Sequence, residues 1–577
     1  MPDPTNAQIA ALFDELGDLY ELDGAIVHRV VAYRNAAKAV REAPVSVAAL
    51  TREGRVTELP GIGKTLEAKI QALLETGSIP AVEKLRAKFP PGLVDLTRLP
   101  GLGPKRARKL FDELGVASLD GLKEAAETQR LRKLRGFGES FEKSVLLAFE
   151  TGIPDARAPR VLLHRGLEAG EAIVDGLAAH PAAGDVILAG GVRRLADSVK
   201  DLDIVATSGD PAALTAGLGE LDVVESCSRS GENGARARLH TGLEIDLRVV
   251  APDQLGNLLQ HFTGSKEHNV RLREMAVRKG LHVSEYGVLD DATGETRRCA
   301  TEEEVYALLG LPFIAPELRE DRGELDPGFV HPELVTVEDL QGDLHCHTTA
   351  SDGRASIEEM AVQARENGLG YLCITDHSAT HGFNNHVTAD ELRRQIERVR
   401  EADARVEGIK ILIGTETNIL PDGNPDYEDD LLAELDWVVA SVHTAFRTPH
   451  VEMTKRIVTA LEHPYVDCLG HPTGRLIGRR DGYTFDLDEV FATAARTQTM
   501  MEINGNPNRR DLRDTHARAA RQAGVRIVIN SDAHGPETLT VTRWGVATAR
   551  RAWLTRDDVA NTLPWEQFAP LRKRARA

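Results

Sequence analysis

A strand-like run in the C-terminal half of the chain reads Asp343-Leu344-His345-Cys346-His347. Successive side chains of a strand point to opposite faces, so this spacing places the two imidazoles on one face and the Cys346 thiol on the other. Asp352 follows in a predicted turn. Because imidazoles and carboxylates are metal ligands, the run predicts a strand that ends at a metal site.

Apolar runs farther along the chain also end in residues that can bind a metal. In chain order these residues are His377, Glu416, His443, His471, Asp532 and His534. Strands that each deliver such a residue at the C-terminal end are typical of a (β/α) barrel. A single buried histidine is usually structural, but nine ligand-type residues at comparable positions favour a metal centre. Histidine and carboxylate ligands without a thiolate favour Zn²⁺, Mn²⁺ or Fe²⁺ over Ca²⁺.

A separate acidic cluster is predicted between residues 190 and 250. The run Asp201-Leu202-Asp203 puts two carboxylates on the same face of a strand, and a later strand-like run supplies Asp246. Three clustered aspartates repel one another unless cations lie among them. Two Mg²⁺ or Mn²⁺ ions would serve, one to activate an attacking hydroxyl and the other to stabilise a leaving pyrophosphate. The glycine pair and arginines from Gly190 to Arg194 favour this interpretation over an ordinary strand edge.

The N-terminal residues 1–150 have a helical pattern that is interrupted by three Gly-x-Gly loops. The glycines are Gly61 and Gly63 in the first loop and Gly101 and Gly103 in the second, and a weaker third loop spans 134–138. Each loop precedes a predicted helix, whose exposed first amides can hold a DNA phosphate without sequence preference. Lys105 and Arg106 follow the second loop as cationic partners. The alternative is three ordinary helix–helix turns beside a solvated basic face.

The composition indicates an ordinary multidomain globular protein. The chain has 577 residues, with 42% hydrophobic and 28% charged side chains, and lacks an apolar run long enough for a membrane span. Five scattered cysteines without a Cys-x-x-Cys pair argue against a disulfide framework and favour a cytoplasmic location. The net charge of −19 argues against broad polyanion binding, but residues 1–150 are balanced, with 22 Lys+Arg and 21 Asp+Glu.

These motifs resemble those of two families. Residues 1–315 resemble the family X DNA polymerases, the DNA polymerase beta group, in the glycine loops, the aspartate run and the stretch His261-Phe262-Thr263-Gly264-Ser265. Residues 341–577 resemble the PHP (polymerase and histidinol phosphatase) domain in the His-x-His run and the ligand positions after it. The resemblance implies a multidomain α+β and α/β chain: a helix-hairpin-helix region, a nucleotidyltransferase palm with a thumb, and a distorted (β/α) barrel. This order is similar to that of the bacterial and archaeal type of family X polymerase.

The expected domain boundaries follow changes in pattern along the chain. A stretch rich in proline and acidic residues, from Ile314 to about Asp339, is interpreted as a linker. In chain order the expected parts are a helical lyase-like DNA-binding domain (1–90), a helix-hairpin-helix fingers domain (91–155), a palm (156–250), a thumb (251–315), a linker (316–340) and a PHP phosphoesterase domain (341–577).

The polymerase resemblance implies roles for individual residues. The expected catalytic metal ligands are Asp201, Asp203 and Asp246, and the residues expected at the incoming nucleotide are Gly190, Gly191, Arg194, His261, Phe262, Gly264 and Asn269. Two of them depart from the family pattern. Gly191 lacks the usual serine hydroxyl, and His261 replaces the usual tyrosine, which leaves sugar discrimination open. Lys69 stands where similar proteins place a Schiff-base lysine, with an ordinary surface lysine as an equal alternative.

The PHP resemblance implies three metal ions of the Zn²⁺, Mn²⁺ or Fe²⁺ type. The expected ligand sets are His345, His347, Glu416 and Asp532 for the first ion, Glu416, His443 and His471 for the second, and Asp352, His377 and His534 for the third. Glu502 and Asn504 end one more strand-like run and are weaker candidates. The basic residues Lys455, Arg475, Arg479 and Arg480 either guide a DNA backbone or are plain surface charge.

Together the two resemblances imply a repair DNA polymerase that fills short gaps by template-directed nucleotidyl transfer. They also imply a metal-dependent 3′→5′ exonuclease with 3′-end and abasic-site processing activity. The implied partners are dNTPs and gapped or nicked duplex DNA with a 5′-phosphate, with no membrane, and the chain is expected to be a monomer. One alternative is a PHP nuclease whose inactive polymerase region only binds DNA. Another is a small-molecule phosphatase of the histidinol-phosphate type with a helical interaction module.

Overall fold

The computed structural model describes residues 3–97, 102–134, 136–150, 160–231, 233–380 and 386–573. The chain forms two compact units. The first comprises Met1–Val161, Ala169–Leu188 and Lys200–Pro252, and the second comprises Leu162–Glu168, Ala189–Val199 and Asp253–Ala577. The short segment 189–199 therefore belongs to the unit that contains the C-terminal half, although the chain on both sides of it belongs to the first unit.

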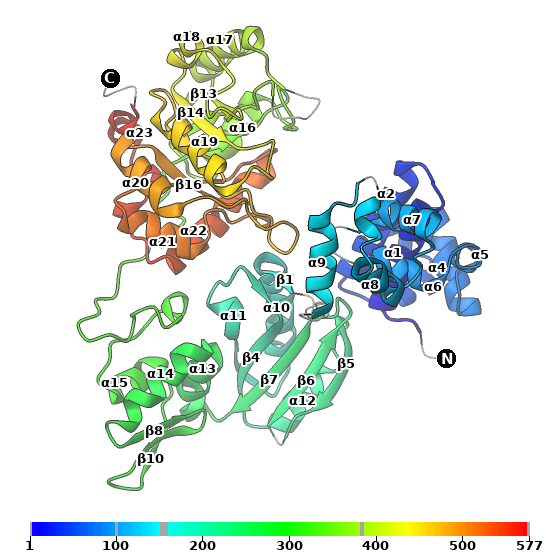
Figure 1. The fold of residues 1–577 in the computed structure, drawn as a ribbon. Helices are drawn as coiled ribbons and strands as arrows, with labels where there is room; N and C mark the ends of the chain where they lie inside the picture. Colours follow the sequence, from blue (N-terminus) through cyan, green and yellow to red (C-terminus); the bar gives the residue numbers. More distant parts are fainter. Residues whose placement is uncertain are drawn as a thin grey trace. The chain divides into compact units, whose positions relative to one another are not determined.

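The N-terminal part of the first unit consists of short helices (Figure 1). In chain order they are α1 (Asn6–Leu22), α2 (Val27–Glu42), α3 (Val47–Arg52), η1 (Val56–Glu58), α4 (Lys64–Thr76), α5 (Pro80–Arg86), α6 (Pro91–Thr97), α7 (Pro104–Leu114), α8 (Leu119–Glu127), η2 (Leu131–Lys133) and α9 (Glu139–Glu150). Their apolar faces share one core that includes Ile9 and Phe13. Thr5 forms a capping box at the start of α1, and glycines in the left-handed conformation, Gly77 and Gly115, end α4 and α7.

The rest of the first unit is built on a five-stranded sheet. Its strands, in spatial order, are β2 (Ala183–Leu188), β4 (Asp201–Ser208), β7 (Glu244–Val250), β6 (Gly234–Leu239) and β5 (Val224–Arg229). Strands β4 and β7 are parallel neighbours at the centre, and the other pairs are antiparallel (Figure 1). Helix α12 (Pro211–Leu218) packs on the sheet, while β1 (Val161–Leu162) and α10 (Leu163–Ala178) belong partly to each unit.

The second unit begins with a small mixed region. Its elements are α11 (Gly190–Arg193), β3 (Ser198–Val199), η3 (Pro252–Gln254), α13 (Leu255–Thr263), α14 (Lys266–Val277), β8 (Leu281–Ser284), β9 (Gly287–Asp290), β10 (Thr296–Arg297), α15 (Glu302–Leu308) and η4 (Pro316–Leu318). Strands β8, β9 and β10 form an antiparallel sheet, and Leu272 of α14 and Tyr306 of α15 lie in the core beside it. Leu318, Leu325 and Leu334, from the stretch interpreted as a linker, are buried in the same core.

The C-terminal part of the second unit is a seven-stranded parallel sheet whose spatial order equals its chain order. The strands are β11 (Gly342–Cys346), β12 (Tyr371–Ile374), β13 (Lys410–Asn418), β14 (Trp437–Ser441), β15 (Cys468–Leu469), β16 (Met500–Asn504) and β17 (Ile527–Asn530). The first and last strands meet, because Cys346 bridges to Ala533 and the amide of Asp532 donates to the carbonyl of His345 at 2.9 Å. The sheet is thus a nearly closed barrel, which confirms the predicted fold class.

Helices surround this barrel (Figure 1). They are α16 (Ile357–Glu366), α17 (Ala389–Arg405), α18 (Asp429–Ala433), α19 (His450–Glu462), α20 (Leu487–Thr497), α21 (Asp514–Gln522), η5 (Pro536–Val541), α22 (Thr542–Arg551), η6 (Arg556–Asp558), η7 (Ala560–Thr562), α23 (Trp565–Phe568) and η8 (Ala569–Leu571). Most strand residues are buried, as expected for a parallel sheet that is covered by helices. Trp437 and Phe568 pack against each other, with ring centroids 5.4 Å apart.

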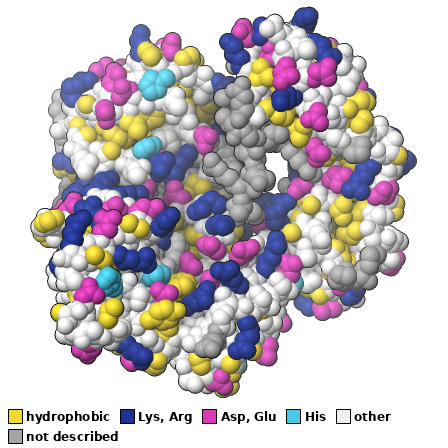
Figure 2. Space-filling view, turned by 60° about the horizontal axis from the view of Figure 1, so that its bottom comes forward, with side chains coloured by type: hydrophobic (Ala, Val, Ile, Leu, Met, Phe, Trp, Pro, Cys, Tyr) yellow, Lys and Arg dark blue, Asp and Glu magenta, His cyan; other side chains and the backbone are white. Residues whose placement is uncertain are grey.

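One face of the molecule carries side chains of both charges. On the face drawn in Figure 2, Lys and Arg side chains are intermingled with Asp and Glu side chains. Each helix in the described part of the chain is too short or too polar to cross a lipid bilayer.

Candidate active sites

Glu416 lies at the centre of the histidine-rich cluster in the barrel. It is carried by β13 and is fully buried. Its Oε1 atom lies 2.9 Å from Nε2 of His471 and 3.1 Å from Nε2 of His443. Its Oε2 atom lies 2.8 Å from Nδ1 of His377 and 3.3 Å from Nε2 of His345. One carboxylate thus faces four imidazoles that are delivered by four other strands.

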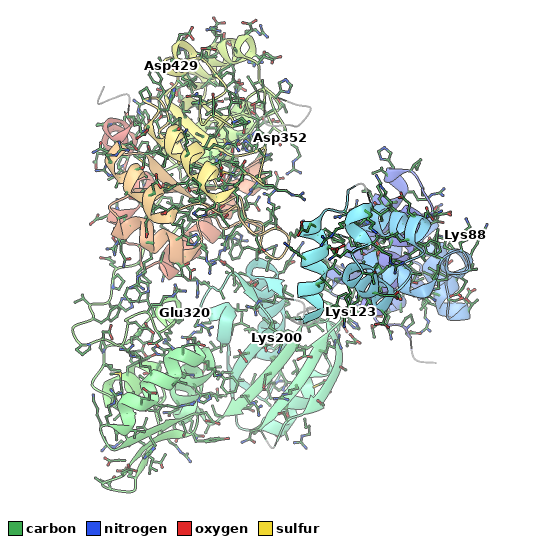
Figure 3. The ribbon with its side chains drawn as sticks, in the orientation of Figure 1. Lys88, Lys123, Lys200, Glu320, Asp352 and Asp429 are labelled. Carbon is green, nitrogen blue, oxygen red and sulfur yellow. The ribbon has the colours of Figure 1, made fainter. Side chains whose placement is uncertain are left out.

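Two aspartates complete the other side of the cluster. Oδ1 of Asp532, which follows β17, lies 3.1 Å from Nε2 of His347. Asp352, labelled in Figure 3, lies in the loop after β11, and its Oδ2 atom is 3.2 Å from Nε2 of His534. Its Oδ1 atom is 3.6 Å from Nε2 of His377. All nine residues predicted as metal ligands therefore converge on one end of the barrel.

Three groups of these residues are compact enough to hold an ion, with donor atoms within 4.8 Å of one another. They are His347, Asp352, His377 and His534; His345, His347 and Asp532; and His377, Glu416 and His443. The grouping differs from the predicted sets. His347 also joins the third set, and His377 takes the place of His471 beside Glu416 and His443. Glu416 does not belong to the compact group of His345, His347 and Asp532, and His471 reaches the cluster through its contact with Glu416.

The donor set fits divalent metal ions. Both carboxylate oxygens of Glu416 and Nε2 of His345 are buried and make no hydrogen bond of good geometry. Buried polar atoms normally have partners, so such atoms aimed at one another indicate that a cation belongs between them. Nδ1 of His345 lies 2.7 Å from Oε1 of Glu502, which leaves Nε2 to face the cluster. A histidine held by a carboxylate in this way is typical of metal ligands.

The electrostatics of the metal-free cluster follow from its charge pairs. Burial disfavours the charged form of Glu416, but the imidazoles of His443 and His345 outweigh it and hold the pKa of this carboxyl well below its usual range. Burial likewise opposes protonation of His345, but the carboxylates of Glu502 and Glu416 raise the pKa of this imidazole well above its usual value. Burial lowers the pKa of His443 to about 4.

The two weaker candidates, Glu502 and Asn504, support this cluster from β16. Oε2 of Glu502 accepts a hydrogen bond from the amide of His471 at 2.6 Å, and Nδ2 of Asn504 donates to Oδ2 of Asp532 at 3.0 Å. Sequence reasoning missed Arg509, whose Nε atom lies 3.8 Å from the same oxygen of Asp532. The available signal was its position in the loop directly after β16.

The four basic residues predicted near this site differ in their surroundings. Arg475 pairs with Asp197, with Nη1 2.8 Å from Oδ2. Arg480 stacks over the ring of Phe446 and donates to the carbonyl of Gly474. The side chains of Lys455 and Arg479 are exposed. Two of the four side chains therefore have contacts within the protein, and two face solvent.

The three aspartates of the palm lie on the two central strands of the first unit. Asp203 of β4 is in register with Asp246 of β7, and Asp201 precedes Asp203 by two residues on the same face. Nε of Arg248 lies 2.8 Å from Oδ1 of Asp246, and Nε of Arg236 lies 3.6 Å from its other oxygen. The register of two adjacent parallel strands thus places the predicted acidic trio on one face of the sheet. Among the described residues, the three carboxylates are not one of the groups whose donor atoms all lie within 4.8 Å of one another.

Two motifs predicted to bind the nucleotide meet within the second unit. Gly190, with φ of +61°, begins the short helix α11, and Arg194 caps its end. Nη1 of Arg194 donates to the carbonyl of Thr263, and a Cβ atom at Gly264 would lie only 3.1 Å from that nitrogen. Gly264 therefore permits the close approach of the guanidinium, a role that its φ of +68° also favours. A side chain at Gly191 would press on Val199.

The residues around His261 form a hydrogen-bonded group. Nδ2 of Asn269 donates to the carbonyl of His261 at 2.7 Å, and Nη2 of Arg273 lies 3.1 Å from Nδ1 of His261. The ring of Phe262 packs 5.7 Å from the imidazole. Burial lowers the pKa of His261, against the opposing effect of Glu285, so the imidazole is neutral and can accept from Arg273.

The described glycines of the N-terminal loops are open on their outer side. Gly61 has φ of +87°, and Gly63 and Gly103 are the N-caps of α4 and α7. A Cβ atom at any of the three would meet nothing within 4 Å, so a phosphate has access to the helix amides. Gly101, which was predicted to bind DNA with them, lies outside the described residues.

The basic residues of this region fall into two kinds. Lys105 is exposed at the first turn of α7. Arg106 stacks on the rings of Phe137 and Phe141 and donates to the carbonyl of Gly136 at 3.1 Å, so its guanidinium holds the third loop. Lys69 is half-buried, with Nζ 6.0 Å from the centre of the Tyr33 ring.

Comparison with known proteins gives a match along nearly the whole chain. Family models match a helix-hairpin-helix domain over residues 4–79, a SAM-like helix-hairpin-helix tandem over 93–151, a DNA polymerase beta thumb over 258–320 and a PHP domain over 343–505. The chain is 39% identical over 569 residues to the DNA polymerase/3′-5′ exonuclease PolX of Bacillus subtilis (strain 168), covering 98% of this chain and 99% of the relative. The chain belongs to the family X DNA polymerases that carry a PHP domain.

Shorter similarities extend to proteins of another description. A probable phosphatase of Thermoanaerobacter sp. (strain X514) is 30% identical over 231 residues, which cover 38% of this chain and 89% of that protein. One of Caldanaerobacter subterraneus subsp. tengcongensis is 32% identical over 203 residues, or 33% of this chain. Membership of the family X polymerases with a PHP domain implies a dependence on divalent metal ions, DNA binding and dNTP substrates.

Proposed function

We propose that this family X member is a repair DNA polymerase that fills short gaps by template-directed nucleotidyl transfer from dNTPs. Its PHP barrel is a metal-dependent 3′→5′ exonuclease that also processes 3′ ends and abasic sites. One observation carries the proposal: the chain has two separate sets of ligand-type residues, the three aspartates on one face of β4 and β7 and the nine residues at the barrel mouth. A relative named for both activities matches it along 98% of its length.

In the polymerase half, Asp201, Asp203 and Asp246 would hold two Mg²⁺ or Mn²⁺ ions. When bound, the ions would lower the pKa of a primer 3′-hydroxyl and stabilise the leaving pyrophosphate. Arg194, at the end of α11, is proposed to bind the triphosphate, since a guanidinium is suited to phosphate oxygens. The remaining residues proposed to contact the nucleotide are Gly190, Gly191, His261, Phe262 and Asn269.

In the barrel, eight residues in three compact groups, together with His471 beside Glu416, would hold three ions of the Zn²⁺, Mn²⁺ or Fe²⁺ type. When bound, these ions would polarise a phosphodiester and activate water for its hydrolysis. Glu502 holds His345 through Nδ1, which fixes the proton on that nitrogen and directs Nε2 to the cluster. Arg509, beside Asp532, is placed to neutralise a phosphate oxygen.

The proposed DNA partner is a gapped or nicked duplex with a 5′-phosphate, which the monomeric chain would bind through the loops at Gly61, Gly63 and Gly103 with Lys105. The proposed division into domains follows the expected boundaries, with the palm at 156–250, the thumb at 251–315 and the PHP domain at 341–577. Lys69, beside Tyr33, remains a candidate lyase nucleophile.

The test is incubation of the metal-loaded protein with a 5′-phosphorylated gapped duplex, with and without dNTPs. We expect primer extension with dNTPs and 3′ shortening without them. Asp203→Asn should abolish extension alone, and Glu401→Gln, an exposed carboxylate on α17, should change neither activity. The alternative is a PHP nuclease with an inactive polymerase region, which the departures at Gly191 and His261 favour. A wild-type protein that shortens but never extends the primer would establish that alternative.

A further inference from the structure

The segment 189–199 carries Gly190 and Arg194, yet it belongs to the same compact unit as the barrel. Its backbone carbonyls and its acidic side chain are contacted by three arginines of the barrel: Arg475, Arg510 and Arg551. Arg510 and Arg551 have no predicted role at either site, and Arg475, a candidate for guiding DNA, is paired with Asp197 instead. The contacts of these arginines indicate that they fix the position of segment 189–199, called the nucleotide-binding loop below.

Arg510 makes the most extensive of these contacts. Its guanidinium donates to the carbonyl of Leu195 at 3.0 Å and to the carbonyl of Ala196 at 3.1 Å. It also donates to Oγ1 of Thr548 at 2.8 Å, and Nη1 lies 3.4 Å from Oδ1 of Asp197. The side chain is 1% exposed. A charged group is buried this completely only where its donors have partners, so the loop and Arg510 depend on each other.

Arg551 extends the same network to Arg194 itself. Nη1 of Arg551 donates to the carbonyl of Arg194 at 2.6 Å, and it also contacts Oε1 of Glu320 at 2.8 Å. Nε of Arg194 donates to the same oxygen of Glu320 at 3.1 Å. Glu320 (labelled in Figure 3) thus receives both guanidinium groups. The backbone and the side chain of Arg194 are therefore both fixed by groups outside the palm.

Asp197 is the matching contact on the loop side. Its two oxygens face Arg475 at 2.8 Å and Arg510 at 3.4 Å, and the side chain is 28% exposed. Nη2 of Arg475 also donates to the carbonyl of Arg510. The barrel arginines therefore hold segment 189–199 in two ways. They donate hydrogen bonds to the backbone carbonyls of residues 194–196, and they form ion pairs with the side chain of Asp197.

Arg510 lies between a residue beside the metal cluster and a residue that fixes the loop after His471. Arg509 lies 3.8 Å from Asp532, and Asp511 accepts from the amide of Thr473 at 3.0 Å, two residues after His471. Arg510 has φ of +45°, a left-handed conformation that is unfavourable for arginine. In the loop after β16, Arg509 therefore lies beside the barrel site, and the next residue, Arg510, contacts the nucleotide-binding loop.

We propose that Arg510 is a positioning residue for nucleotide binding in the polymerase half, acting through the backbone of 194–197 to hold Arg194 where it meets the triphosphate. The inference rests on the proposed function, since it assumes that Arg194 binds the nucleotide. The PHP barrel is then a structural part of the nucleotide-binding site, in addition to its own activity. Arg510 itself touches neither substrate nor metal.

The test compares Arg510→Gln with Arg513→Gln, an exposed arginine three residues away. Each full-length variant is assayed for nucleotide KM and kcat on a one-nucleotide gap, and for 3′ shortening without nucleotides. We expect Arg510→Gln to raise KM by about 10-fold with kcat within about 2-fold of wild type. Arg510→Lys should recover part of the affinity, and Arg513→Gln should behave as wild type. An unchanged KM in Arg510→Gln would overturn the proposal.

A second variant covers the case in which Arg510→Gln fails to fold. Asp197→Asn weakens the same ion pairs from the nucleotide-binding loop and changes no residue of the barrel. It should also raise the KM for the nucleotide and leave 3′ shortening unchanged. Because Arg510 is proposed to act through Arg194, the double variant R194Q/R510Q should bind nucleotide no more weakly than R194Q alone. Additive losses would contradict that mechanism, as would a normal KM in Asp197→Asn.

Equilibrium binding separates this inference from the proposed function. Binding of a Mg²⁺-dNTP to the wild-type complex with a dideoxy-terminated gapped duplex measures nucleotide affinity without any transfer. If the wild type binds the nucleotide but never extends a normal primer, the proposed function fails, and the comparison with Arg510→Gln still stands. If Arg510→Gln binds it as tightly as wild type, the inference fails alone.

Discussion

At the scale of single residues, the barrel cluster depends on carboxylates that play unequal parts. Glu416 faces four imidazoles directly, whereas Glu502 lies behind them and contacts His345 and the amide of His471. Both are fully buried. A buried carboxylate that orients a ligand matters through the direction in which it holds the imidazole, so replacing it changes metal affinity before it changes the fold.

For Glu502→Gln we expect metal affinity at the barrel to fall by about 10- to 100-fold, with a parallel loss of 3′ shortening. The amide can still contact Nδ1 of His345, but it lacks the charge that favours a basic imidazole. Mn²⁺ titration followed by metal analysis measures the affinity, with Glu401→Gln as the matched exposed control. Full metal occupancy at wild-type concentrations of Mn²⁺ would contradict this role.

Metal binding at the barrel should also depend on pH. Burial opposes the charged form of His534, but its hydrogen bond to Asp352 and the charge of Asp532 raise the pKa of this imidazole to about 9. In the metal-free protein His534 is therefore protonated at neutral pH, and an ion must displace that proton. The apparent affinity for Mn²⁺ should rise as pH increases from 6.5 towards 9. Calorimetry in buffers of different ionisation enthalpy measures the released protons, and a pH-independent affinity would exclude this competition.

At the scale of elements, two neighbouring basic residues of one helix have different contacts. On α7, Lys105 faces solvent beside the open N-cap at Gly103. Arg106 lies between the rings of Phe137 and Phe141 and fixes α7 to the third loop. Adjacent positions on a helix point about 100° apart, so this division follows from the geometry of α7.

Substitution of Lys105 should therefore affect DNA binding, whereas substitution of Arg106 should affect stability. Lys105→Gln should weaken binding to gapped duplex and lower the slope of log affinity against log salt by about 1, with unchanged thermal stability. Arg106→Gln should lower stability by about 1 kcal/mol because it loses the stacking and the hydrogen bond to Gly136. Salt-dependent binding and thermal unfolding distinguish them, and a salt slope unchanged in Lys105→Gln would exclude the phosphate contact.

Much of the element order was predictable, because the informative signals are local. The barrel strands are short apolar runs that end in ligands, and alternation along Asp343–His347 predicted which side chains share a face. Contacts between distant segments left no such signal. Neither the stacking of Arg106 nor the approach of Arg194 to Gly264 can be read from spacing. The buried leucines of 316–340 lie in a stretch whose proline and acid content indicated only a linker.

At the scale of the whole chain, the two activities should be separable by mutation because their metal ligands do not overlap. His345→Ala should abolish 3′ shortening and spare primer extension, while Asp246→Ala should do the reverse. Both activities are measured on the same gapped duplex with matched metal concentrations. Loss of both activities in either variant, with a normal unfolding temperature, would refute independent sites.

The path of the chain through its two units has a consequence for how such a gene can change. Residues 189–199 are encoded within the palm, but Arg510 and Arg551 from the far end of the chain hold their carbonyls. A split of the gene near codon 340 would place these partners on separate polypeptides. The hydrogen bonds of Arg510 and Arg551 to residues 194–196 would then form between two chains, and their formation would depend on the concentration of both chains. Replacement of the barrel by that of a related protein would require the new barrel to carry arginines that can bind the carbonyls of residues 194–196.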